Sequence, residues 1–173
     1  MKKGKNLYAN NYFKRSDFLS DRIRELIKDK KFFEIVLWFS NIFEGELTII
    51  LSLYEKIIKH TDEIHHKFLL AYNPREPEDI RNESRTLGFL KNELSRYLRD
   101  KEIESLLKNF IETRNKIFHK FFETSEDPKI TEKEIESRID TWWRLAYQLN
   151  REMGKCFNNY NELLEIETKK KGE

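Results

Sequence analysis

The sequence predicts an all-α protein, an antiparallel bundle of about five helices, and two observations support this fold class. Only five Gly and three Pro interrupt the 173 residues, which is too few turn formers for many short strands. Strong helix formers such as Leu, Glu and Lys are abundant. A chain of this length buries one core, so we expect residues 1–173 to form a single helical domain.

The N-terminal region is basic, with ten Lys and Arg against four Asp and Glu in residues 1–31. We expect residues 1–15 to be a flexible basic arm. A short helix then begins at Ser16 or Asp17, and its inward-facing residues are Phe18, Ile23, Leu26 and Ile27. The positive excess suits a polyanion such as RNA, although basic arms are also an ordinary solubilising feature.

A long apolar segment predicts a second helix from about Phe32 to near His60, or as far as Tyr72. Its apolar stretch is long enough to cross a bilayer, but Glu44 and Glu46 lie near the middle, where an unpaired carboxylate is costly. A buried helix of a soluble protein therefore fits better than a membrane span. Because no apolar run follows the basic start, we predict no secretory signal and expect a cytoplasmic protein without membrane association.

The second helix ends at the sequence NPREP, residues 73–77, because each proline disfavours helix in its predecessor and lacks an amide donor. A third helix is predicted over 78–98. Its apolar face consists of Leu87, Leu90, Leu94 and Leu98.

Two more helices follow. The fourth spans about 102–122, and the polar loop TSEDPKI comes after it. Thr131 and Glu134 form a capping-box sequence that predicts the start of the fifth helix, which ends near Glu165. Residues 166–173 are expected to be a disordered tail.

The fourth predicted helix carries one misplaced charge. On a helical wheel its apolar residues fall within an arc of about 160°, and Arg114 lies near the centre. The residues of this arc are Ile103, Leu106, Leu107, Phe110, Ile111, Ile117, Phe118, Phe121 and Phe122. Because an unpaired buried guanidinium is costly, Arg114 needs a partner, a polar cleft, or an earlier end to the helix.

Asn115 and His119 lie on one flank of this wheel, beside Arg114. Such a group suits phosphoryl chemistry: an imidazole takes the proton of an attacking ribose 2′-OH, a guanidinium binds phosphate oxygens, and an amide orients either group. A two-fold dimer that joins two copies of the helix would supply both an acid and a base. The spacing also fits a purely structural role, with Arg114 in an ion pair and His119 solvated.

Arg114, Asn115 and His119, near the end of a long helix that follows the segment TLGFLKNEL, resemble the signature of the HEPN family (higher eukaryotes and prokaryotes nucleotide-binding). The resemblance covers residues 32–165. It implies a helical bundle that dimerises through this helix. It also implies that His119 is the general base or acid, Arg114 the phosphate clamp and Asn115 the positioning residue. Many members are metal-independent endoribonucleases of toxin–antitoxin, abortive-infection and antiviral defence systems, and others only bind.

This chain departs from the family pattern in two places. Some HEPN toxins that are controlled by a partner nucleotidyltransferase carry Tyr two residues after the His, where this chain has Phe121, so we do not expect that control. Lys120 replaces a residue that is often small in relatives and is either an RNA-phosphate contact or simply exposed. Lys116 is a second candidate for RNA contact.

Three other residues are candidates for a site or for its support. Glu46 is a second charge within an apolar arc. It is a candidate partner of Arg114 or His119, unless that face reaches solvent. Trp142 and Trp143 fit core aromatics better than base-stacking platforms. The sequence has no phosphate-binding glycine loop and no cluster with metal-ligand spacing, so no cofactor and no metal are expected.

We therefore predict a homodimeric, metal-independent HEPN endoribonuclease that cleaves RNA by 2′-OH attack, acting as a toxin or antiphage defence effector. A cognate antitoxin or regulator protein is the candidate protein partner. The alternative is a non-catalytic HEPN module that binds RNA or a protein, for instance as a neutralising subunit.

Overall fold

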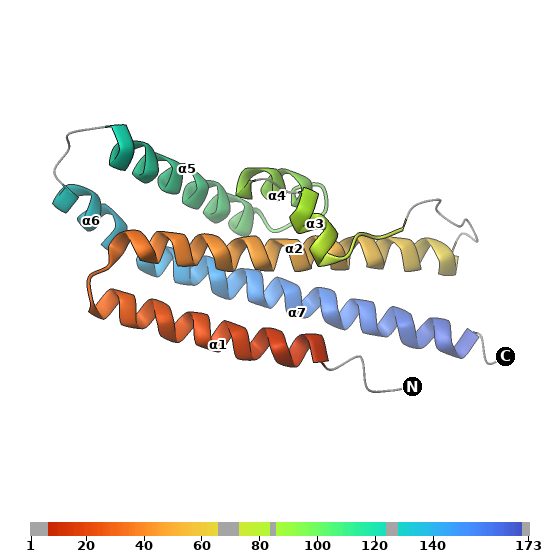
Figure 1. Cartoon of the computed structure of the whole chain (residues 1–173). Coiled ribbons are helices and arrows are strands. Elements are labelled where there is room, and N and C mark those ends of the chain that lie inside the picture. The colour runs from red at the N-terminus through yellow and green to blue at the C-terminus, as the bar shows by residue number, and fades with distance from the viewer. Residues whose placement is uncertain (1–6, 66–72, 84–85, 124–127, 171–173) are drawn as a thin grey trace.

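The computed structural model describes residues 7–65, 73–83, 86–123 and 128–170. Within these residues the chain forms seven α-helices and no strand, which confirms the predicted all-α class (Figure 1). The helices are α1 (Leu7–Lys28), α2 (Phe32–His65), α3 (Pro77–Glu83), α4 (Leu87–Leu94), α5 (Lys101–Glu123), α6 (Pro128–Glu136) and α7 (Ile139–Lys170).

Helix α2 lies at the centre of the fold, and α1 packs against it in the opposite direction (Figure 1). A tight turn joins the two helices. The Lys30 amide donates to the Ile27 carbonyl at 3.1 Å, and the Lys31 amide donates to the Leu26 carbonyl at 2.9 Å. These two bonds form a Schellman cap with Lys30 in the left-handed region at φ 57°. The short turn folds α1 back along α2.

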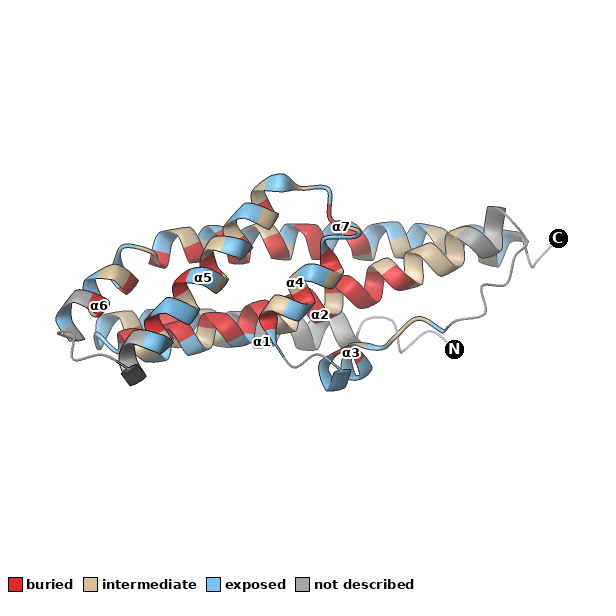
Figure 2. Ribbon diagram, turned by 90° about the horizontal axis from the view of Figure 1, so that it is seen from above, coloured by how far each residue is buried: buried red, intermediate tan, exposed pale blue. Residues whose placement is uncertain are grey.

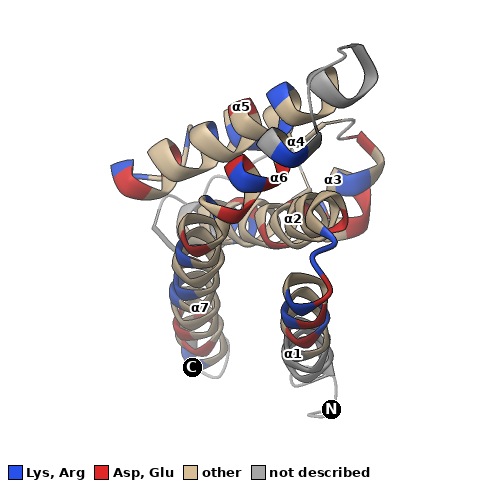
Figure 3. Ribbon diagram, turned by 90° about the vertical axis from the view of Figure 1, so that its left-hand side faces the viewer, with Lys and Arg blue, Asp and Glu red and all other residues tan. Residues whose placement is uncertain are grey.

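Helix α7 packs along α2 in the same direction as α2. The contacts between the two helices advance together along the chain, as these pairs show: Phe39 with Trp142, Tyr54 with Glu152, and His60 with Glu167. Helix α5 runs the other way and crosses over α2 obliquely (Figures 1 and 3). The return along α5 and α6 brings the chain back to the end where α2 starts, so α7 runs parallel to α2.

Aromatic residues fill the core where α2, α5 and α7 meet. Phe43 and Phe110 have ring centroids 4.6 Å apart, and the ring of Trp142 contacts both Phe39 and Phe110 edge-on. These four side chains are buried, and Figure 2 shows buried residues along α2 and in stripes on α5 and α7. Trp142 is therefore a core residue, as predicted, and Trp143 packs half-buried against Phe39.

Two predicted helices are each divided in two, which explains why seven helices replace the expected five. The predicted helix over 78–98 becomes α3 and α4, because the Thr86 hydroxyl accepts a hydrogen bond from the Phe89 amide and caps a new helix. The predicted last helix becomes α6 and α7, which are separated by a turn at Ser137.

The structure also moves several predicted helix ends. Helix α6 begins at Pro128, a residue favoured in a first helical turn because its missing amide needs no partner there. Thr131 consequently lies inside α6, and its capping-box sequence does not start the helix. Helix α1 begins at Leu7 and α7 continues to Lys170, so part of the predicted arm and part of the predicted tail have helical backbone.

Helix α2 is the one helix among the described residues that is long and apolar enough to cross a membrane, by length and composition over Phe32–Thr61. The core helix of a soluble protein meets the same criterion, and 67% of the most apolar window is buried inside this fold. Its buried carboxylates Glu46 and Glu55 also suit a protein core with polar partners better than lipid.

Candidate functional site

Arg114 lies on α5 at the edge of the buried stripe. The core side of α5 is formed by Ile103, Leu107, Phe110 and Ile117, which are all buried. Arg114 itself is half-buried, because α5 crosses α2 obliquely and its C-terminal end rises away from α2 (Figure 1). The Arg114 guanidinium thus reaches the border between core and solvent.

Three neutral groups hold the guanidinium. Its Nε donates to Ser40 Oγ on α2 at 3.1 Å, and its Nη1 donates to Asn115 Oδ1 at 3.2 Å. The Arg114 Cζ also lies 5.3 Å from the centre of the Phe118 ring, within the range of a cation–π contact. None of the ion pairs between described residues involves Arg114, so the predicted structural ion pair is not formed among them.

The contact between Ser40 and Arg114 was not predicted from the sequence. Ser40 is 4% exposed, and its hydroxyl donates to the Val36 carbonyl at 2.8 Å in the preceding turn of α2. That bond uses the hydroxyl proton and leaves the oxygen lone pairs to accept from Arg114. The signal was a Ser on the buried face of an apolar helix, in the run WFSNIF.

Asn115 and His119 are exposed and lie one turn apart on α5. Asn115 follows Arg114 and accepts its hydrogen bond, so the structure brings these two predicted site residues together. Lys116 is also exposed, but it forms an ion pair with Glu134 of α6 at 3.1 Å. The side chain of Lys120 lies outside the described part of the structure.

Glu46 is buried, with 2% exposure, whereas the contacts of Arg114 among the described residues are with Ser40, Asn115 and Phe118. Because α5 runs antiparallel to α2, Arg114 is level with Ser40 and Phe110 is level with Phe43. Glu46 lies six residues beyond Ser40, about 9 Å further along α2, and therefore faces an earlier part of α5. The structure does not bring this predicted supporting residue to the Arg114 group.

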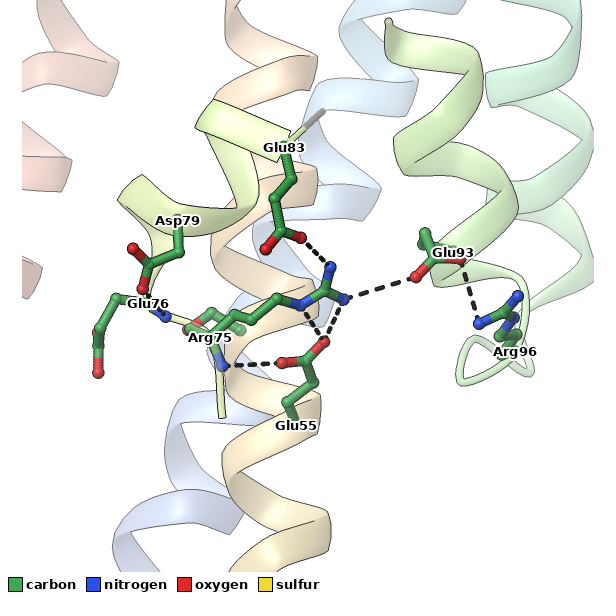
Figure 4. Close-up of polar contacts among 8 residues, drawn as sticks. Glu55, Arg75, Glu76, Asp79, Glu83, Glu93 and Arg96 are labelled. Carbon is green, nitrogen blue, oxygen red and sulfur yellow. Dashed lines mark hydrogen bonds and ion pairs between the residues drawn. The ribbon is translucent and has the colours of Figure 1, made fainter. Parts of the chain in front are cut away.

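A second arginine, Arg75, is held in a different way (Figure 4). Its Nε donates to Glu55 Oε1 at 2.9 Å, and its backbone amide donates to Glu55 Oε2 at 2.9 Å. Glu83 of α3 and Glu93 of α4 lie 2.7 Å and 3.5 Å from the same guanidinium. The hydrogen bond to Glu55 is the main cause that raises the pKa of Arg75. This cluster ties the segment before α3 to α2, α3 and α4.

Cys156 is not a nucleophile in this fold. It is 2% exposed, and burial, reinforced by the charge of Glu152, raises the pKa of its thiol to about 12. The thiol is therefore protonated and shielded at neutral pH. Over the described residues, no three His, Cys, Asp or Glu side chains are grouped so as to hold a metal ion.

Comparison with protein-family models, with curated proteins and with solved structures finds no match. The resemblance to HEPN domains therefore rests on Arg114, Asn115 and His119 and on their position near the end of a long helix.

Proposed function

We propose that the chain is a metal-independent endoribonuclease of the HEPN type, with Arg114, Asn115 and His119 as its catalytic group. The main supporting observation is the state of Arg114: its charge is held at the solvent border by a hydroxyl, an amide and an aromatic ring, and none of the described carboxylates pairs with it. An arginine held in this way is ready to bind phosphate oxygens.

The proposed reaction is an attack of the ribose 2′-oxygen on the adjacent phosphorus. His119 accepts the 2′-OH proton as the O2′–P bond forms, and Arg114 stabilises the charge on the non-bridging oxygens. The P–O5′ bond breaks, and the leaving 5′-oxygen takes a proton from His119 of the partner subunit. The products are a 2′,3′-cyclic phosphate and a 5′-OH end.

The second imidazole requires a two-fold dimer through α5. Ile111 and Phe118, which flank Arg114 on α5, are only half-buried in the single chain, which supports burial of this flank by a second copy. In this proposal the protein is a cytoplasmic toxin or antiphage effector, held in check by a cognate antitoxin or regulator.

An RNA-cleavage assay tests the proposal. End-labelled RNA incubated with the purified chain in EDTA should yield 2′,3′-cyclic phosphate ends. His119→Ala should reduce cleavage at least about a hundredfold without unfolding the protein. His60→Ala is the matched control. His60 lies in the C-terminal half of α2, where its Nδ1 is 3.2 Å from Glu167 of α7, and it has no role in the proposed reaction.

Three results would contradict the proposal. Unchanged cleavage by a folded His119→Ala protein would show that His119 takes no part in the reaction. Loss of activity in EDTA, restored by one divalent ion, would show that the reaction depends on a metal. RNA that is bound but not cleaved by the wild-type chain would support the non-catalytic HEPN module instead.

A further inference from the structure

A second candidate site lies far from Arg114, between the later half of α2, the connection from α4 to α5, and α7. It is an open pocket of about 680 Å³ whose lining includes Tyr54, Tyr97 and Arg99. Tyr54 follows Ser40 by fourteen residues on α2, so the two sites are about 20 Å apart along that helix. Neither the motif on α5 nor the proposed reaction uses these residues.

One wall of the pocket is aromatic. The rings of Tyr54 and Tyr97 stack with centroids 5.7 Å apart and planes inclined by 17°. The Tyr54 hydroxyl donates to Glu152 Oε1 at 2.7 Å, which fixes the orientation of the pair. Ile58 and Leu98 add apolar surface beside the rings. The outer face of such a stacked pair suits a planar aromatic ligand.

The two carboxylates that line the pocket are already used by the protein. Asp100 Oδ1 accepts hydrogen bonds from the amides of Glu102 and Ile103 and so caps α5. Glu152 accepts from Tyr54 and pairs with Lys155 at 2.8 Å. Neither carboxylate therefore needs a cationic ligand.

Two arginines in the lining are available to an anion. Arg99 is exposed and forms no ion pair with any described residue. Arg96 is 69% exposed and lies 3.2 Å from Glu93, a contact that solvent weakens and that a ligand can replace. The pocket thus combines a planar apolar wall with two guanidiniums at its rim.

We propose that this pocket binds a nucleoside phosphate, either free or as one unit of an RNA strand. The base lies against the Tyr54 and Tyr97 wall, and Arg99 and Arg96 hold the phosphate. The inference does not rest on the proposed cleavage, and its test measures binding alone, so either can fail without the other.

Calorimetric titration with AMP and with a 2′-O-methyl adenosine hexamer tests the inference, since the hexamer cannot be cleaved by 2′-OH attack. Arg99→Gln should weaken binding about tenfold, because it removes a charge-assisted contact from an exposed side chain. Arg24→Gln is the matched control, since Arg24 is 71% exposed on α1.

A second pair of variants tests the aromatic wall. Tyr97→Leu should weaken binding about five- to tenfold through lost stacking, whereas Tyr147→Leu, at a tyrosine that is 68% exposed on α7, should not change it. If Arg99→Gln weakens both ligands, similar affinities for AMP and the hexamer would assign the site to a free nucleotide. Hexamer binding that is at least tenfold tighter than AMP binding, and that Arg99→Gln weakens, would assign it to RNA. The inference fails if neither ligand binds at about 1 mM, or if a folded Arg99→Gln protein binds as the wild type does.

Discussion

Two arginines that lie partly inside the protein are held in opposite ways. Arg75 is surrounded by the carboxylates of Glu55, Glu83 and Glu93, and the Glu55 side chain is only 5% exposed. Arg114 is held by the Ser40 hydroxyl and the Asn115 amide, with an aromatic ring nearby. The charge of Arg75 is neutralised within the fold, whereas no carboxylate in the described part of the chain pairs with Arg114.

This difference separates a structural arginine from a candidate functional one. A guanidinium among carboxylates has its charge already balanced and does not bind a further anion, and its removal leaves a buried carboxylate without a counter-charge. A guanidinium held by neutral groups keeps its net charge and can bind a phosphate, and its removal leaves no carboxylate without a counter-charge. The predictions below test this contrast, starting with the largest expected effect.

Replacing Arg75 should damage the fold most. Arg75→Ala removes the guanidinium that neutralises the buried Glu55 carboxylate and should lower the free energy of unfolding by about 3 kcal/mol. Urea denaturation measures the change. Glu83→Ala removes a carboxylate that is 54% exposed from the same cluster and should cost less than about 1 kcal/mol. Equal losses of unfolding free energy in the two variants would contradict the idea that Arg75 neutralises a buried carboxylate.

Replacing Arg114 should affect activity and spare the fold. Arg114→Ala should reduce RNA cleavage about a hundredfold or more, while the free energy of unfolding changes by less than about 1 kcal/mol. Lys108→Ala is the control on the same helix, because Lys108 is 66% exposed and lies 3.9 Å from Glu112, away from the proposed site. If Arg114→Ala destabilised the protein as much as Arg75→Ala, Arg114 would be structural and the contrast would be lost.

Ser40 should act as a positioning residue for Arg114. Ser40→Ala removes the acceptor of Arg114 Nε and should lower kcat about tenfold with little change in KM. Thr48→Val is the control, because the Thr48 hydroxyl makes the same kind of bond to the Glu44 carbonyl on α2 and does not contact Arg114. A purely structural Ser40 would give the same stability loss as Thr48→Val and unchanged cleavage.

The effect that is smallest at neutral pH comes from the Cys156 thiol, which should lower stability only at alkaline pH. Burial raises the pKa of the Cys156 thiol from 9.0 to about 12, so the folded chain keeps a proton that the unfolded chain releases above about pH 9. Stability should therefore fall between pH 9 and 12, by at most about 1.4 kcal/mol per pH unit from this group. Cys156→Ala should flatten the slope of melting temperature against pH. The Arg75 cluster stays charged in this range, since its carboxylates raise the arginine pKa further.

Some features of the site follow from the pattern of α5 alone. The 3.6-residue period places Arg114 among apolar neighbours and puts Asn115 and His119 one turn apart on one flank. The contact of Arg114 with Ser40 did not follow, because Ser40 is 74 residues away in the chain and comes to Arg114 only through the crossing of α2 and α5. Nor did the pattern place Glu46, whose level along α2 depends on the register of that crossing.

The break between α3 and α4 also could not be predicted from the apolar pattern. The leucines at 87, 90, 94 and 98 are all buried, as the sequence predicted, although α4 ends at Leu94 and Leu98 lies beyond it. The start of α4 at Thr86 depended on a local side-chain hydrogen bond, which competes with continuation of the helix and is not visible in the apolar period.

The sequence by itself determined the helical class, the buried faces and the misplaced charge at Arg114, because each depends on residues within a few turns of one helix. Only the tertiary structure decided that α7 runs parallel to α2, that carboxylates surround Arg75 and that Arg114 has neutral partners among the described residues. Those outcomes depend on how the helices pack and in which register. An amphipathic pattern indicates that one face of a helix is buried, but it does not indicate which neighbouring helix covers that face.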